Sequence, residues 1–122
     1  MTVRILAIDD SPTIRGLVSR ALKKAGFDVF LAADGQDGVE ALQASDPDLI
    51  ITDVNMPRLD GFGVIEAIRA SPSHSNVPIL VLTTEHGSEL KARARQVGAT
   101  GWIVKPFDDV QLVSVIDRVL RR

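Results

Sequence analysis

Five short apolar runs, separated by longer segments with helical spacing, are the feature that most constrains how this chain folds. Each run is too short and too continuous for an amphipathic helix, and therefore predicts a buried β-strand. The runs are residues 3–8, 29–32, 49–51, 79–82 and 102–104. Between the runs, apolar residues step by three and four, as they do from Ile14 to Ala25, which predicts helices with one apolar face.

The expected helices begin and end at residues that commonly mark helix termini. Ser11 and Pro12 supply a cap and a first-turn proline, Gly26 follows the first helix, and Asp108 and Asp109 precede the last one. Strands that alternate with helices predict parallel pairing, because a helical crossover returns the chain in the same direction. We therefore expect an α/β fold: a five-stranded parallel sheet with helices on both faces. Precedent for sheets of this size favours the flavodoxin-like strand order 2-1-3-4-5.

Length and composition fit one domain in a reducing cytoplasm. The 122 residues, 45% of them hydrophobic, can bury a single core, so residues 1–122 are expected to form one domain without an attached output domain. There is no cysteine, and the N-terminal apolar run is too short for a signal peptide or a membrane span. A net charge of -2 gives no basis for holding nucleic acid. We expect a cytoplasmic monomer that binds neither nucleic acid nor membrane.

Polar side chains follow four of the five predicted strands. Asp9 and Asp10 follow the first strand, Asp53 the third, Thr83 the fourth and Lys105 the fifth. Because the carboxyl ends of parallel strands meet at one edge, where open sheets bind ligands, these residues are expected to converge. Three carboxylates beside one lysine would recruit a cation, and oxygen ligands favour Mg²⁺, with Mn²⁺ as an alternative. The sequence therefore predicts a metal-dependent phosphoryl site.

Each of these residues taken alone has an ordinary structural explanation. An aspartate after a strand often caps the next helix, Thr83 can be a strand-end hydroxyl, and Lys105 a solvated charge. Trp102 can be a core residue beside a buried strand. Their joint occurrence at the ends of different strands is what favours the functional interpretation.

Four segments carry a specific combination of motifs: Asp9-Asp10-Ser11; Asp53-Val54-Asn55-Met56-Pro57 with Asp60-Gly61; Leu82-Thr83-Thr84; and Lys105-Pro106-Phe107. This combination resembles bacterial response-regulator receivers of the single-domain chemotaxis (CheY-like) type, and the likeness extends over essentially the whole chain. It implies a response regulator of a two-component phosphorelay, in which Asp53 takes a phosphoryl group from the phosphohistidine of a sensor histidine kinase. Such a protein is a signalling switch, not an enzyme beyond its own autophosphorylation and autodephosphorylation.

The resemblance assigns roles to the residues around Asp53. Asp10 and Asp53 would ligate Mg²⁺, Asn55 would add its backbone carbonyl, and Asp9 would orient a metal-bound water. Lys105 would pair with a phosphoryl oxygen. Transfer of this kind depends on positioning and charge neutralisation, so no histidine base is required.

The resemblance also implies a switch and a reset rate. Thr83 would move toward the phosphoryl group while Trp102, where the family more often has Tyr or Phe, turns inward. Asn55 and Glu85 resemble the fast-resetting chemotaxis pattern and predict a short-lived phosphoryl state. Thr84 replaces a small residue common in the family, and its bulk would narrow access to the phosphoryl group.

The implied partners are a chemotaxis kinase-like sensor histidine kinase and a flagellar motor switch protein or another protein target. Basic residues on the predicted fourth and last helices would form a strip beside Trp102 that suits an acidic peptide, although a solvated helix face remains the alternative. They are Lys91, Arg93, Arg95, Arg118, Arg121 and Arg122. His74 and His86 lie in polar, loop-like sequence without companion ligands and receive no role.

Three alternatives differ in the use of the site or in its chemistry. A phosphorelay intermediate or phosphate sink would use the same chemistry and stays open. An aspartyl-phosphate phosphohydrolase of the haloacid dehalogenase type needs a second aspartate two residues after the nucleophile, where this chain has Asn55. A flavin carrier shares the expected fold, but three carboxylates oppose an FMN phosphate.

Overall fold

Strand and helix alternate five times in the computed structural model, which describes residues 2–121. In chain order the elements are β1 (Arg4–Ile8), α1 (Pro12–Lys24), β2 (Asp28–Ala32), α2 (Gly35–Ser45), β3 (Leu49–Thr52), α3 (Gly61–Ala70), β4 (Ile79–Thr83), α4 (Ser88–Val97), β5 (Gly101–Val104) and α5 (Asp109–Arg121). The strands pair in parallel in the order β2-β1-β3-β4-β5. The expected fold class and strand order are confirmed, and the predicted strand ends differ from the observed ones by at most one residue.

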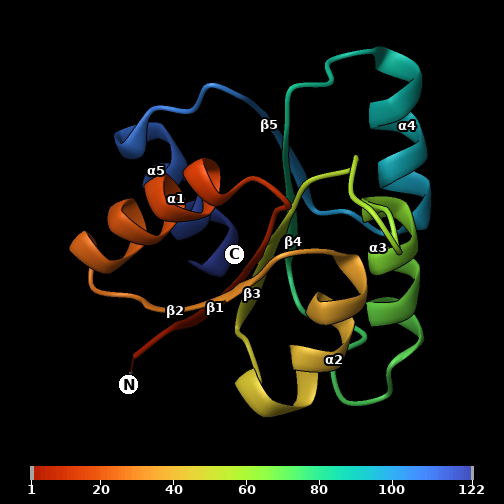
Figure 1. Ribbon diagram of the computed structural model, residues 1–122, viewed down its shortest axis with the longest axis horizontal. Coiled ribbons are helices and arrows are strands. Elements are labelled where there is room, and N and C mark those ends of the chain that lie inside the picture. Colours follow the sequence, from red (N-terminus) through yellow and green to blue (C-terminus); the bar gives the residue numbers. More distant parts are fainter. Residues whose placement is uncertain (1, 122) are drawn as a thin grey trace.

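The sheet separates two layers of helices. Helices α1 and α5 cover one face, and α2, α3 and α4 cover the other (Figure 1). Among residues 2–121, no helix has both the length and the apolar character that crossing a bilayer requires.

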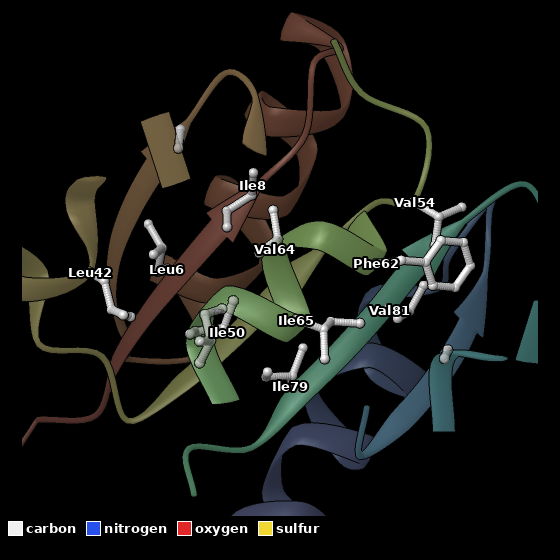
Figure 2. Packing of buried hydrophobic residues seen from close by; sticks show 13 residues of the cluster. Leu6, Ile8, Leu42, Ile50, Val54, Phe62, Val64, Ile65, Ile79 and Val81 are labelled. Atoms are coloured by element: carbon white, nitrogen blue, oxygen red, sulfur yellow. The ribbon is translucent and has the colours of Figure 1, made fainter. Parts of the chain in front are cut away.

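Each face of the sheet carries its own core, because successive residues of a strand point to opposite sides. Leu6 and Val81 belong to the core beneath α2, α3 and α4, whereas Ile5 and Leu80 belong to the core beneath α1 and α5. In the first core, Phe62 of α3 lies beside Val81 (Figure 2). Coverage on both faces explains why the inner strands are continuously apolar in the sequence.

Side-chain caps fix the start of three helices at the carboxyl edge of the sheet. Ser11, Asp34 and Asp60 each accept a hydrogen bond from the backbone N–H three residues later. Such caps satisfy N–H groups that have no partner inside the helix. Because Ser11 and Asp60 stand in the loops that follow β1 and β3, their caps also hold two loops that carry the candidate site.

Two helix glycines differ in their surroundings and so test the packing of α2 on the sheet. A Cβ at Gly38 would overlap Cδ1 of the buried Ile8, whereas a Cβ at Gly16 would meet nothing within 4 Å. We expect Gly16→Ala to raise the free energy of unfolding by about 1 kcal/mol, since alanine is the better helix former. Gly38→Ala should lower it by about 1 kcal/mol, because overpacking a core costs more than helix propensity returns. Urea denaturation measures both changes, and stabilisation by Gly38→Ala would contradict the tight packing.

Candidate functional site

Three side chains from different strand ends form one buried ion-pair cluster. Lys105 Nζ lies 2.7 Å from Oδ2 of Asp9 and 2.8 Å from Oδ2 of Asp53. Asp9 follows β1, Asp53 follows β3 and Lys105 follows β5, so the sheet order brings them together. Each of these side chains is at most 10% exposed. The predicted convergence at the carboxyl edge is therefore observed for these three residues.

The environment of Lys105 keeps its ammonium group charged. Partial burial alone would lower the pKa of Lys105, but its hydrogen bonds with Asp53 and Asp9 and their negative charges outweigh burial, so the pKa is raised. Because the pKa is higher in the folded than in the unfolded chain, this contribution to stability is present at neutral pH. It is lost only in alkaline solution, as the pH rises through the raised pKa.

Both carboxylate oxygens of Asp53 have donors. Oδ2 accepts from Lys105, while Oδ1 accepts from the N–H of Val54 at 2.6 Å and, more weakly, from that of Asn55 at 3.4 Å. Asp53 itself is 8% exposed. The carboxylate is thus held in one orientation beside a cation, at the surface edge of the sheet.

Asp10 completes a group of three carboxylates. Ligand oxygens of Asp9, Asp10 and Asp53 all lie within 4.8 Å of one another, and Asp10 is exposed while the other two are buried. One ammonium group cannot neutralise three carboxylates, so negative charge remains at this edge. Hard oxygen donors with an open, solvated side fit a divalent cation that keeps several of its waters. The residues present therefore suit the predicted metal.

Glu85, in the loop after β4, connects the loop after β3 with Trp102. Its Oε2 accepts a hydrogen bond from Asn55 Nδ2 at 3.0 Å, and its backbone carbonyl accepts from Trp102 Nε1 at 3.0 Å. Its N–H donates to Oγ1 of the fully buried Thr83 at 3.3 Å. Sequence reasoning singled out these residues but did not connect them, because nothing in their spacing indicates that their side chains meet. Thr84 is exposed in the same loop.

The predicted basic strip is only partly present. Lys91 and Arg95 line a small cavity of about 60 Å³ together with Trp102. Arg93 was wrongly included, since its guanidinium lies over the ring of Phe62, 4.1 Å from the centroid, and so faces α3. On α4, the basic charge beside Trp102 therefore comes from two residues.

On α5, Arg118 and Arg121 line a separate hollow with Val110 and Val113, which does not include Trp102. Arg122 lies outside the described residues. Arg118 and Arg121 therefore line a different hollow from the one beside Trp102, where the predicted strip placed them.

His74 has surroundings that its sequence context did not reveal. It is 7% exposed, its Nε2 lies 2.9 Å from Oδ1 of Asp46, and its Nδ1 lies 2.9 Å from Oγ of Ser73. The contact with Asp46 could not be predicted from spacing, because the two residues are far apart in the sequence. These contacts fasten the loop before β4 to the end of α2, which is a structural role. His86 is exposed.

An apolar surface lies next to the ion-pair cluster. Ile14 and Leu17 of α1 line a shallow cavity of about 110 Å³ with Pro106 and Phe107, which directly follow Lys105. Leu17 is 42% exposed. This partly exposed apolar surface beside the charged cluster is a candidate protein contact.

Known proteins resemble this chain in sequence and in structure. Residues 5–117 match the profile of the response regulator receiver domain. A probable transcriptional regulator, ycf27 of Porphyridium aerugineum, is 38% identical over 98% of this chain, which spans 48% of that protein. The chain spans about half the length of two further curated relatives as well.

Two solved structures match all or nearly all of the chain. The chemotaxis protein CheY4 of Vibrio cholerae has a TM-score of 0.94 and 44% identity, covering 98% of this chain and 99% of that one. The receiver domain of the sensor histidine kinase PA1611 from Pseudomonas aeruginosa PAO1 has a TM-score of 0.92 and 28% identity, covering 100% of both chains. Its structure has a magnesium ion coordinated in the active site cleft.

Removing the shared cation should destabilise the fold. We expect Lys105→Met to lower the free energy of unfolding at neutral pH by roughly 2–4 kcal/mol, because it leaves two buried carboxylates unpaired. The deficit should shrink in alkaline solution, because the wild type loses the same positive charge as the pH rises through the raised pKa of Lys105. Urea titrations at several pH values measure this, with the exposed Lys23→Met as control. A deficit that is independent of pH would contradict the charge explanation.

Proposed function

The chain belongs to the response regulator receiver domain family, and from this premise we propose that Asp53 accepts a phosphoryl group from the phosphohistidine of a sensor histidine kinase. The observation that carries the proposal is the buried Asp53 carboxylate, 2.8 Å from Lys105 Nζ and within reach of two further carboxylates. In the transfer, an Asp53 oxygen forms the new bond to phosphorus while the bond from phosphorus to the histidine nitrogen breaks. The product is an acyl phosphate, and the bonding electrons stay on the histidine nitrogen. The imidazole leaves in its neutral form when its other ring nitrogen carries a proton during the transfer.

The residues around Asp53 position it and balance charge. The N–H groups of Val54 and Asn55 hold one oxygen, and Lys105 holds the other. Once Asp53 is phosphorylated, the phosphoryl oxygens become the stronger acceptors, and Lys105 Nζ is close enough to pair with one of them. This chemistry needs positioning and charge neutralisation instead of a general base. The proposed activity is limited to the chain's own phosphorylation and dephosphorylation.

We propose that Asp10, Asp53 and the backbone carbonyl of Asn55 hold Mg²⁺, or Mn²⁺ in its place, with Asp9 contributing through a water. The three clustered carboxylates support this ligand set. A bound divalent cation would neutralise the charge of the incoming phosphoryl oxygens. Lys105 alone leaves the cluster negative, which would repel a phosphoryl donor.

The proposed switch acts through Glu85. The Thr83 hydroxyl accepts the Glu85 N–H, and the Glu85 carbonyl accepts the Trp102 indole N–H. If the Thr83 hydroxyl moves to a phosphoryl oxygen, the Glu85 N–H loses its acceptor and the peptide that holds Trp102 is free to shift. Phosphorylation would thereby change the surface formed by β5 and α4.

Two surfaces suit the proposed partners. The kinase domain that carries the phosphohistidine must cover the edge at Asp53, and the apolar surface of Ile14, Leu17 and Phe107 adjoins that edge. The cavity beside Trp102, with Lys91 and Arg95, suits an acidic peptide. A flagellar motor switch protein is the proposed target, supported by the 44% identity with CheY4. A phosphorelay or phosphate-sink role in the cytoplasm is the second candidate.

Phosphorylation can be tested directly. With Mg²⁺ and acetyl phosphate, intact-mass spectrometry should detect one phosphoryl adduct in the wild type and none in Asp53→Asn. Fluorescence of Trp102, the only tryptophan, should change on addition of Mg²⁺ and again on addition of beryllofluoride. Absence of both an adduct and a fluorescence response to beryllofluoride in the wild type would refute the phosphoacceptor proposal. Continuous hydrolysis of phosphate esters would favour the phosphohydrolase instead.

The lifetime of the phosphoryl group should depend on the bridge between Asn55 and Glu85. This hydrogen bond spans the two loops beside Asp53, so we expect it to govern how water reaches the phosphoryl group. Asn55→Ala and Glu85→Ala should each change the autodephosphorylation rate several-fold, and the double variant should change it by less than the two effects combined. Phosphate release after removal of the donor measures these rates, with the exposed Glu89→Ala as control. Unchanged rates in both single variants would contradict this role.

A further inference from the structure

Within residues 2–121, the outer side of β2 has backbone groups without a strand partner. In this part of the chain β2 is an edge strand that pairs with β1 alone. The N–H of Asp28 and the C=O of Ala32 both bond toward β1. Because alternate residues of a strand turn their N–H and C=O groups to opposite sides, those of Val29 and Leu31 point outward.

This edge lacks the features that usually protect an edge strand from pairing. Natural edges carry lysine, proline or a bulge. The five residues of β2 contain neither lysine nor proline, and Asp28 at the start is their one charged residue. Large apolar side chains are exposed on both faces instead: Phe30 is 37% exposed and Leu31 is 45% exposed.

We propose that β2 pairs antiparallel with β2 of a second copy of this chain, about a two-fold axis at Phe30. In this register, Val29 of one copy and Leu31 of the other exchange both backbone hydrogen bonds, and the symmetry repeats the exchange. Phe30 faces Phe30 of the second copy in a pair without hydrogen bonds, where facing side chains lie closest. Asp28 faces Ala32, so no like charges meet.

The surface beside β2 has room for the second copy. A shallow hollow of about 450 Å³ lies between β2 and α2, lined by Val29, Phe30, Leu31, Ala41, Ala44 and Ser45. The two-fold axis places α2 of the second copy along the same side of the joined sheet. The α2 side chains at this hollow are small, so the two helices can approach to the roughly 8–10 Å at which helices pack.

The self-complementary register is what selects a second copy over an extended peptide of another protein. One symmetric pairing satisfies the outward backbone groups and places apolar side chains against apolar side chains on both faces. The expectation of a monomer from the sequence took no account of this exposure, since residues 29–32 read as a buried strand. None of the residues in the pairing belongs to the proposed phosphoacceptor site, so the proposal stands apart from that function.

Cross-linking tests the register, because the chain contains no cysteine of its own. Facing residues without hydrogen bonds have Cα atoms about 4.5 Å apart, which a disulfide can span. Under mild oxidation, Phe30→Cys should form disulfide-linked dimers at least about tenfold faster than Val110→Cys, whose parent residue is 76% exposed on α5. Equal rates for the two variants would overturn the register.

Sedimentation equilibrium tests the association without a cross-link. The wild type should show concentration-dependent dimers, Leu31→Lys should remain monomeric, and the control Val110→Lys should behave as the wild type. Circular dichroism and phosphorylation by acetyl phosphate should be unchanged in Leu31→Lys, which separates lost pairing from lost folding. A wild type that stays monomeric at its highest soluble concentration would overturn the proposal. The proposal would also be overturned if the dimer were lost in Val110→Lys but retained in Leu31→Lys.

Discussion

The ammonium group of Lys105, shared between two buried carboxylates, is the interaction on which the candidate site depends. It joins the end of β5 to the ends of β1 and β3, so it ties together the first, middle and last parts of the chain. Taking such charges out of water is costly, and apolar residues of similar size often give a more stable fold. Stability therefore gives little reason for this cluster, whereas the proposed phosphoacceptor role of Asp53 gives a functional one.

The backbone around Asp53 is as constrained as its side chain. A Cβ at Gly61 would overlap the carbonyl oxygen of Asp53, and a Cβ at Gly35 would overlap that of Leu59. The N-termini of α3 and α2 can approach the loop after β3 this closely because glycine stands at both positions. Arg58 then ties the loop to α2 through ion pairs with Asp34 and Asp37. The loop is thus positioned before any donor arrives.

The sequence predicted those features that depend on local pattern and on parallel pairing. Apolar runs identified the strands, and the rule that strand ends meet at one edge brought Asp53 and Lys105 together. Contacts that depend on how elements pack were missed: the direction of Arg93 follows from the rotation of α4 over Phe62, and the pairing of His74 joins distant loops. The exposure of Phe30 was missed because an apolar run looks alike in an edge strand and in a central one.

Hydrogen bonds to Glu85 connect the loop after β3, which contains Asn55, with Trp102 of β5. The Glu85 carboxylate accepts a hydrogen bond from the Asn55 amide, and its backbone carbonyl accepts one from the Trp102 indole. Its backbone N–H donates to the Thr83 hydroxyl. A group that enters beside Asp53 and displaces any one of these contacts changes the energy of the others, because all three meet at one residue. Such a residue couples two sites only if the loop has two arrangements of similar energy, and phosphorylation can shift that balance only as far as its contacts differ between them. Apart from Glu85, the loop from Thr84 to Gly87 is exposed, and α4 has no side-chain cap, so little packing opposes a second arrangement there.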